Sequence, residues 1–137
     1  MNFEILEHPA DIGFRARGAT EPELFANCAH ALVSIILDCR DVRPTERFGV
    51  CADGSDYESL LVNFLNEVLY FVDGRRIALG RFDIGRLDEN GIECVAWGEP
   101  RNLERHPPKL VVKAVTYHQL SVRRDDQGWV ADVYVDI

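Results

Sequence analysis

The chain has 137 residues, of which 47% are hydrophobic and 28% charged, and its formal net charge is −8 at pH 7. This length and usage predict one domain, residues 1–137, with a hydrophobic core of its own, and they exclude a disordered or low-complexity chain. The negative charge disfavours direct, stable nucleic-acid binding, because contact with the phosphate backbone rests on clustered Lys and Arg. The arginines at positions 15, 17, 75, 76, 123 and 124 are expected to be scattered rather than joined in a basic patch.

A membrane protein and a cysteine-based redox protein are also disfavoured. No apolar run reaches the length that spans a bilayer, and the first residues lack the basic start and apolar core of a signal peptide, so a cytoplasmic location is expected. The four cysteines lie far apart in sequence without a Cys-x-x-Cys pair. They predict reduced thiols rather than a zinc knuckle or a redox motif.

The first forty residues predict two strands and a helix. Residues 3–7 and 12–17 are typical of strands, separated by a break at His8-Pro9-Ala10-Asp11, which places Asp11 at the start of the second strand. Thr20-Glu21-Pro22-Glu23 has the pattern of a capping box with Pro in the first turn, so a helix is expected to begin there. Apolar residues at helical spacing continue to residue 37.

The middle of the chain repeats this alternation of strand and helix. Residues 42–52 are expected to be extended, and Ser55-Asp56-Tyr57-Glu58 begins a second amphipathic helix over residues 56–73, with Gly74 as its C-terminal cap. Residues 77–87 and 92–98 flank Asp88-Glu89-Asn90-Gly91, whose Asn-Gly pair favours a β-hairpin. Residues 99–108 are expected to form a loop.

Residues 109–137 predict a second hairpin around Asp125-Asp126-Gln127-Gly128. In its second arm the odd positions form an apolar face that is expected to be core, comprising Trp129, Ala131, Val133, Val135 and Ile137. The side chain of Asp136 and the α-carboxylate of Ile137 then lie within one residue of each other on a strand held by packing. Because two such anions repel unless a cation joins them, the chain end is a candidate site.

Together these elements predict an α+β fold, with a mainly antiparallel sheet and two amphipathic helices on one of its faces. Irregular alternation of strands and helices argues against a parallel sheet built from βαβ units.

Several stretches together resemble the archease family. They are Glu7-His8-Pro9-Ala10-Asp11-Ile12-Gly13, the helix from Leu60-Leu61 to Leu69-Tyr70, Lys113-Ala-Val-Thr-Tyr-His118, and Gly128-Trp129 leading to the terminal Asp136-Ile137. The resemblance extends over essentially the whole chain and implies the archease form of a strand–helix–strand–strand module.

The resemblance implies an activator rather than an enzyme. Its partner would be the RNA ligase of tRNA splicing, whose guanylylation it promotes so that the ligase completes multiple turnovers. The family's metal site matches Asp11, Asp136 and Ile137, and a functional family lysine matches Lys113.

Three carboxylates without sulfur favour Ca²⁺, with Mg²⁺ or Mn²⁺ as competitors, since hard cations prefer oxygen ligands. His8 or His118 as a further ligand would admit Zn²⁺, although a solvated or hydrogen-bonded histidine is the simpler expectation. Asp132 shares the strand face of Asp136 but lies four residues away, about 13 Å along a strand, so it is excluded from the same metal site.

Two other classes of function remain open. One is a metal-dependent hydrolase, because carboxylates and a histidine are able to activate water through a metal. The sequence lacks a recognisable nucleophile motif, a phosphate-binding glycine loop and a His-x-x-x-His pair, which disfavours this class. The other is a chaperone or modulator of a nucleic-acid-modifying enzyme that acts without a metal.

Overall fold

The computed structural model describes residues 2–8 and 11–137. These residues form strands and two long helices in the order β1 (Phe3–His8), β2 (Asp11–Gly18), α1 (Glu21–Ile36), β3 (Glu46–Asp53), α2 (Tyr57–Leu69), the short helix η1 (Tyr70–Gly74), β4 (Ile77–Asp88), β5 (Gly91–Pro100), β6 (Ala114–Val115), β7 (Ser121–Asp125) and β8 (Gly128–Asp136). Of the break expected at residues 8–11, residues 9 and 10 lie outside the described residues, whereas His8 and Asp11 belong to β1 and β2. Across the described part of the chain, every helix is too short or too polar to cross a bilayer.

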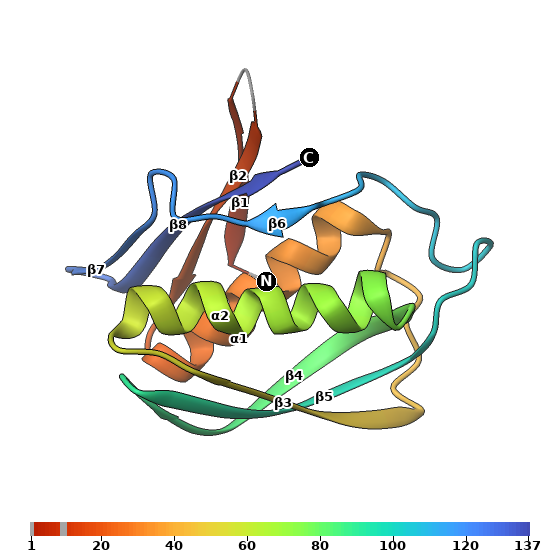
Figure 1. The fold of residues 1–137 in the computed structure, drawn as a ribbon, viewed down its shortest axis with the longest axis horizontal. Helices are drawn as coiled ribbons and strands as arrows, with labels where there is room; N and C mark the ends of the chain where they lie inside the picture. Colours follow the sequence, from red (N-terminus) through yellow and green to blue (C-terminus); the bar gives the residue numbers. More distant parts are fainter. Residues whose placement is uncertain (1, 9–10) are drawn as a thin grey trace.

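The strands form two antiparallel sheets with the helices between them (Figure 1). One sheet has the strand order β1-β2-β8-β6, with β7 also paired to β8, and the other has the order β3-β5-β4. Helix α1 contacts β2 and β4, whereas α2 contacts β3 and β6. The α+β class, the two helices and the antiparallel strands are therefore confirmed. The strands are divided between two sheets instead of joined in one, so each helix is covered on two sides.

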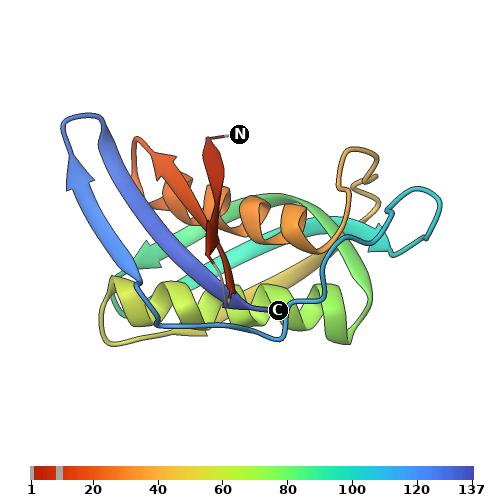
Figure 2. The same cartoon turned by 90° about the horizontal axis from the view of Figure 1, so that it is seen from above.

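Helix α1 begins where its capping signal lies. The Thr20 hydroxyl accepts a hydrogen bond from the Glu23 amide at 3.3 Å, and Pro22 occupies the first turn. Seen from above, α1 and α2 lie side by side (Figure 2), and the rings of Phe25 and Phe64 join them with centroids 6.0 Å apart. Because sheets cover both sides of α1, more of its surface is apolar than a single stripe provides, and its buried residues are Leu24, Phe25, Cys28, Ala29, Ala31, Leu32, Val33, Ile35 and Ile36.

Helix α2 begins one residue later than the sequence pattern predicts. Its N-cap is Asp56 rather than Ser55: the Asp56 carboxylate accepts from the Ser59 amide at 2.8 Å, and the Ser59 hydroxyl accepts from the Asp56 amide at 3.2 Å. The helix ends in the π-helical turn η1, closed by a hydrogen bond from the Arg75 amide to the Tyr70 carbonyl at 2.9 Å. The left-handed residue after it is Arg76, with φ of 59°, so Gly74 is not the left-handed cap.

Both predicted hairpins are confirmed. In the β4–β5 hairpin the Asp88 carboxylate accepts from the amides of Asn90 and Gly91 at 2.9 and 3.0 Å. In the β7–β8 hairpin Asp125 pairs with Gly128, which has φ of +120°. A Cβ at Gly128 would lie 2.7 Å from the Gly18 carbonyl oxygen, so only glycine fits this turn.

The first arm of the last hairpin is not the continuous strand that its alternating sequence predicts. The amides of Lys109 and Leu110 donate to the carbonyls of Ile36 and Ile35, at 2.9 and 3.1 Å. These two residues therefore bond to the C-terminal end of α1 and not to a strand. Only the short strand β6 then pairs with β8 before a turn in which Gln119 has φ of 52°. Terminal helix carbonyls have no partner within their own helix, so this segment satisfies two of them.

The apolar face of β8 is confirmed except at its end. Ala131, Val133 and Val135 are fully buried and Trp129 is half-buried, whereas Ile137 is 46% exposed. The expectation that packing holds the last side chain is therefore wrong. The physical reason is that β8 ends at Asp136, so Ile137 extends beyond the paired part of the sheet.

The loop before β6 is held by a buried ionic cluster. The Glu99 carboxylate accepts hydrogen bonds from the Arg105 guanidinium and from the Arg43 amide, the latter at 2.7 Å. His106, only 1% exposed, accepts from the Asn102 amide through Nδ1, so Nε2 carries the proton that faces Glu99 at 3.1 Å. These contacts fix the chain that leads towards residue 113.

We expect Glu99→Gln to lower the free energy of unfolding at pH 7 by about 1–3 kcal/mol, because Arg105 and His106 lose a charged acceptor. Hydrogen bonds from Arg105, then those from Arg43 and His106, lower the pKa of Glu99 from 4.5 to about 2. A lowered carboxyl pKa contributes stability that is complete above pH 4.5 and is lost as pH falls towards 2. Chemical denaturation between pH 7 and 2 therefore measures it.

The wild type should lose more stability than Glu99→Gln across that acidic range. Glu104→Gln is the matched control, because Glu104 is an exposed residue of the same loop. Equal pH profiles for wild type and Glu99→Gln would show that the cluster does not stabilise the loop.

Candidate metal centre and the lysine beside it

The start of β2 and the end of β8 lie at the same end of the five-stranded sheet (Figure 1), and these are the positions of Asp11 and Asp136. The antiparallel β2–β8 ladder ends with Ile12 opposite Val135, so Asp11 and Asp136 each lie one residue beyond its last pair. Two residues separated by most of the chain are thus neighbours.

The two carboxylates point away from the helices. Val135 is buried and Ile12 packs against the core, and side chains alternate between the faces of a strand, so Asp11 and Asp136 belong to the outer face. The Oδ1 atom of Asp11 is itself buried. Ile137 follows directly, so the α-carboxylate lies within one residue of this pair. All these donors are oxygen atoms, which suits Ca²⁺, Mg²⁺ or Mn²⁺.

Gly13 makes room for an aromatic ring beside this pair. Gly13 lies opposite Tyr134, and a Cβ added to Gly13 would lie 2.7 Å from two ring carbons of Tyr134. Only glycine therefore lets the tyrosine ring lie across β2 at this point. The His118 ring lies edge-on to that of Tyr134, with ring centroids 6.2 Å apart. No local pattern in the sequence marks Tyr134, and its position opposite Gly13 follows only from the register of β2 against β8.

The two candidate histidines differ in what the structure describes. His8 pairs with Asp11 in the β1–β2 ladder, but its side chain lies outside the described part of the chain. His118 packs on Tyr134. Among the side chains that the structure describes, no three of His, Cys, Asp or Glu are arranged to hold a metal ion. A cation at Asp11 and Asp136 could take the α-carboxylate and water as further oxygen ligands.

Asp132 has a different role from Asp136. It accepts two hydrogen bonds from Arg15, at 2.7 and 3.0 Å, and one from Arg123 at 3.3 Å. The hydrogen bonds from Arg15 are the largest cause of its lowered pKa. Its carboxylate is thus occupied by arginines, in agreement with its exclusion from the metal site.

Lys113 lies next to Asp136 on the side away from Asp11. Its amide donates to the Asp136 carbonyl at 2.8 Å, and Ala114 pairs with Asp136 in the β6–β8 ladder. The lysine side chain, however, lines a groove of about 300 Å³ on the helix side of the sheet, with Asn66, Leu69, Tyr70, Asp73 and Gly74. The structure therefore brings Lys113 and Asp136 together in the backbone but directs their side chains to different faces.

The two lysines of the chain differ in their contacts. Lys109 donates from Nζ to the Ser34 carbonyl at 3.1 Å. The Lys113 ammonium makes no hydrogen bond or ion pair with residues 2–8 or 11–137. The ring of Tyr70 is exposed in the same groove, so the groove is accessible to a partner. Tyr70 also begins the π-helical turn, a type of turn often found at functional sites.

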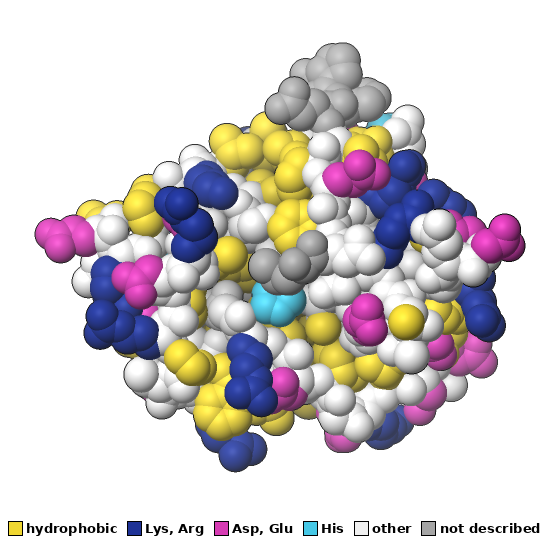
Figure 3. All heavy atoms as spheres, turned by 180° about the vertical axis from the view of Figure 1, so that it is seen from behind, with side chains coloured by type: hydrophobic (Ala, Val, Ile, Leu, Met, Phe, Trp, Pro, Cys, Tyr) yellow, Lys and Arg dark blue, Asp and Glu magenta, His cyan; other side chains and the backbone are white. Residues whose placement is uncertain are grey.

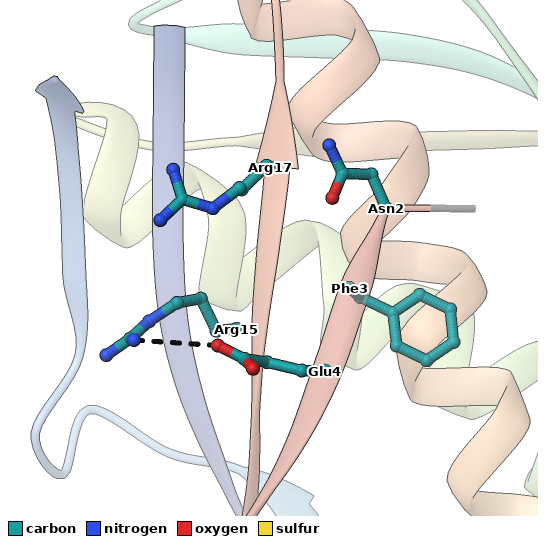
Figure 4. Close-up of a pocket in the computed structure, with 5 residues that line it drawn as sticks. All are labelled: Asn2, Phe3, Glu4, Arg15 and Arg17. Carbon is teal, nitrogen blue, oxygen red and sulfur yellow. Dashed lines mark ion pairs between the residues drawn. The ribbon is translucent and has the colours of Figure 1, made fainter. Parts of the chain in front are cut away.

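Three of the six arginines gather on the outer face of the five-stranded sheet, contrary to the expected scatter. Arg15 and Arg17 line a small pocket of about 160 Å³ with Asn2, Phe3 and Glu4 (Figure 4). Arg15 forms ion pairs with Asp132 and with Glu4, the latter at 3.5 Å, while Arg17 pairs with Asp125 at 3.0 Å. Arg123 completes the group through Asp132.

These arginines are neutralised by neighbouring carboxylates. Cationic and acidic side chains are also interspersed over the face of the molecule in Figure 3. Neither the cluster nor that face presents the continuous positive surface that phosphate-backbone binding requires.

The protein is thus a small α+β protein with Asp11 and Asp136 at one end of a sheet and a groove lined by Lys113 beside them. Residues 3–137 match the family model of the Archease protein family, and the chain belongs to that family. The protein archease of Methanosarcina acetivorans is 40% identical over 139 residues, with 98% of this chain and 95% of that protein covered. That of Saccharolobus solfataricus is 39% identical over 137 residues, with 98% of each covered.

Solved structures agree with this assignment. The solution structure of protein 1598 from Methanobacterium thermoautotrophicum is 30% identical, with a TM-score of 0.81 and 99% of each chain covered. The crystal structure of a Thermotoga maritima archease, described as a possible chaperone, has a TM-score of 0.68 at 19% identity, with 96% of this chain and 94% of that chain covered. The second likeness concerns the fold alone.

Proposed function

We propose that this protein activates the RNA ligase of tRNA splicing by promoting its guanylylation, and that it does so with a divalent cation held by Asp11, Asp136 and the Ile137 carboxylate. The observation that carries the proposal is the β2–β8 register, which makes Asp11 and Asp136 neighbours at the chain end, with Lys113 bonded to the Asp136 backbone on the other side. Membership of the archease family supports the same assignment.

Guanylylation defines what such an activator has to supply. A side chain of the ligase forms a bond to the α-phosphorus of GTP, and the bond from that phosphorus to the bridging oxygen breaks, so that pyrophosphate leaves. Charge accumulates on phosphate oxygens during this transfer, and positioning together with positive charge accounts for most of its catalysis. The Lys113 ammonium lines the groove beside α2 and is available to an anionic group of the ligase or its nucleotide.

Asp11 and Asp136 would hold the cation on the other face. A Ca²⁺ ion bound there would supply positive charge and order the chain end. The carboxylates themselves are poor partners for phosphate oxygens, so without a cation they would repel the nucleotide. The lysine groove and the carboxylate pair thus act from two faces of one sheet end.

Mixing the protein with a stalled ligase, GTP and a divalent metal tests this function. We expect covalent ligase–guanylate to accumulate faster than without the protein. Equal rates would contradict the proposal. Turnover of GTP or of simple esters by this protein alone would favour the metal-dependent hydrolase instead.

The second candidate is a chaperone that modulates its partner without a metal. The Thermotoga maritima relative is described as a possible chaperone, and the groove beside Lys113 offers exposed apolar surface. With the divalent metal of the assay kept, stimulation that persists in Asp136→Ala would favour this candidate, whereas loss of stimulation in that variant supports the metal-dependent activator.

We further expect that appending a few residues after Ile137 weakens calcium binding by at least about tenfold, because a charged ligand is removed while both aspartates remain. Calorimetric titration with Ca²⁺ measures the change. Asp126→Asn, which removes one negative charge at the exposed hairpin turn, is the control for long-range electrostatics. Equal affinity in the extended protein would exclude the α-carboxylate as a ligand.

A further inference from the structure

Asn66 takes the place of a neighbouring strand at the open edge of β6. Its Oδ1 accepts from the Val115 amide at 3.0 Å, and its Nδ2 donates to the Val115 carbonyl at 3.3 Å. The oxygen and the nitrogen of the Asn66 side-chain amide thus both bond to the backbone of Val115. Edge strands leave such backbone groups open, and here a side chain of α2 satisfies them.

Strand β6 has few other contacts that hold it in position. It is two residues long, and β8 holds the segment from one side through hydrogen bonds from the amides of Lys113 and Thr116, at 2.8 and 3.1 Å. Val115 is 4% exposed, so water is a poor substitute for Asn66 at its amide and carbonyl. The segment is therefore clamped between β8 and α2.

This clamp acts on the two features of the candidate site at once. Lys113 lies two residues before Val115, and its amide bonds to Asp136. Asn66 and Lys113 also line the same groove. A shift of Val115 would change both the direction of the lysine side chain and the position of the chain end.

We propose that Asn66 is a positioning residue, which sets the register of residues 113–115 against β8 and thereby places Lys113 relative to Asp136. Its importance for activity rests on the proposed function, but its effect on the backbone is measurable without a ligase. In this proposal Asn66 acts through Lys113 rather than on a substrate or a cation.

The same helix provides a matched control. Asn63, three residues earlier, also donates from Nδ2 to a backbone carbonyl, that of Asp53 at 2.8 Å. Asn63→Ala and Asn66→Ala therefore remove the same atoms from α2, and each removes a hydrogen bond from Nδ2 to a backbone carbonyl; Asn66→Ala also removes the acceptor of the Val115 amide. Only the second change affects β6. Asn66→Asp provides an intermediate variant, because it keeps an acceptor for the Val115 amide and loses the donor to its carbonyl.

Amide hydrogen exchange followed by NMR tests the positioning directly. We expect Asn66→Ala to increase exchange at Val115 and Lys113 by at least about tenfold, because both hydrogen bonds between Asn66 and Val115 are lost and the local opening equilibrium shifts. Asn66→Asp should give a smaller increase at Lys113, and Asn63→Ala none. Unchanged exchange at Lys113 in Asn66→Ala would overturn the proposal. If Asn66→Ala does not fold, the Lys113 amide of Asn66→Asp gives the decisive comparison.

Stimulation of ligase guanylylation provides the functional test. We expect Asn66→Ala to reduce stimulation by about tenfold, and Lys113→Ala to cause little further loss in that background, because residues acting through one another are not additive. Fully additive losses, or unchanged stimulation by Asn66→Ala, would overturn the link to Lys113. If the wild type itself does not stimulate, the proposed function fails, and the exchange measurement alone decides the role of Asn66.

Discussion

Leu65→Asp is expected to abolish the folded state. Leu65 is fully buried on α2, between the two sheets. A carboxylate buried there without a partner costs several kcal/mol, which is comparable with the whole stability of a small domain, about 5–15 kcal/mol. The variant should therefore lack a cooperative melting transition or fail to accumulate as soluble protein. Circular dichroism during heating measures this.

Leu103→Asp is the control for that experiment. Leu103 lies in the loop after β5 and is 74% exposed, so the same substitution should leave the melting temperature unchanged within the usual range for surface changes. A Leu65→Asp protein that melts like the wild type would reject the packing of α2 between the sheets.

Lys113→Ala and Asp136→Ala should each keep the fold and reduce ligase stimulation by at least about tenfold. Both residues are exposed at the sheet end, so neither substitution removes core packing. The first change removes the free ammonium, and the second removes one carboxylate of the candidate cation site. A ligase that already carries guanylate should complete its first joining event with either variant, because the defect lies in restoring the guanylate.

Each variant has a matched control in the chain. Lys109→Ala removes the other lysine, which bonds to the end of α1, and Asp126→Ala removes an exposed aspartate from the hairpin turn. Both controls should stimulate as the wild type does. If Lys113→Ala and Asp136→Ala fold normally and also stimulate fully, these two residues do not form the site.

Local signals in the sequence predicted the helices and the hairpins. Thr20 caps α1, alternation in β8 identifies its buried residues, and the turn residues mark both hairpins. Such signals depend on neighbours within a few residues, so one sequence is enough to recognise them. The N-cap of α2 lies one residue later than expected because Asp56 forms the capping box with Ser59. The usual capping-box pattern has a glutamate or glutamine at that third position, so it points to Ser55 and Glu58 instead.

Contacts between distant residues were less accessible to sequence reasoning. Residues 109–112 have the apolar, β-branched composition of a strand, yet the amides of Lys109 and Leu110 bond to the end of α1, and no local pattern distinguishes those two partners. Glu99 and His106 read as ordinary loop residues, but their burial depends on Arg105 and on the carbonyl of Asp41. The division of the strands into two sheets likewise follows from long-range pairing.

The candidate site was predicted in part. The resemblance to the archease family identified Asp11, Asp136, Ile137 and Lys113, and the structure adds the register that makes the two aspartates neighbours. The exposure of Ile137 and the direction of Lys113 towards α2 were not predicted. The clamp by Asn66 was missed as well, because an asparagine on a helix has no sequence signal for a backbone partner 49 residues away.

The number of RNA joining events per ligase molecule, measured with this protein present in less than equimolar amount, tests the central claim most directly. Each ligase starts with one guanylate, and GTP, a divalent metal and excess RNA ends are supplied. We predict many joining events per ligase with the protein and about one without it, because an activator that restores guanylate is reused. One joining event per ligase in both reactions would contradict the account.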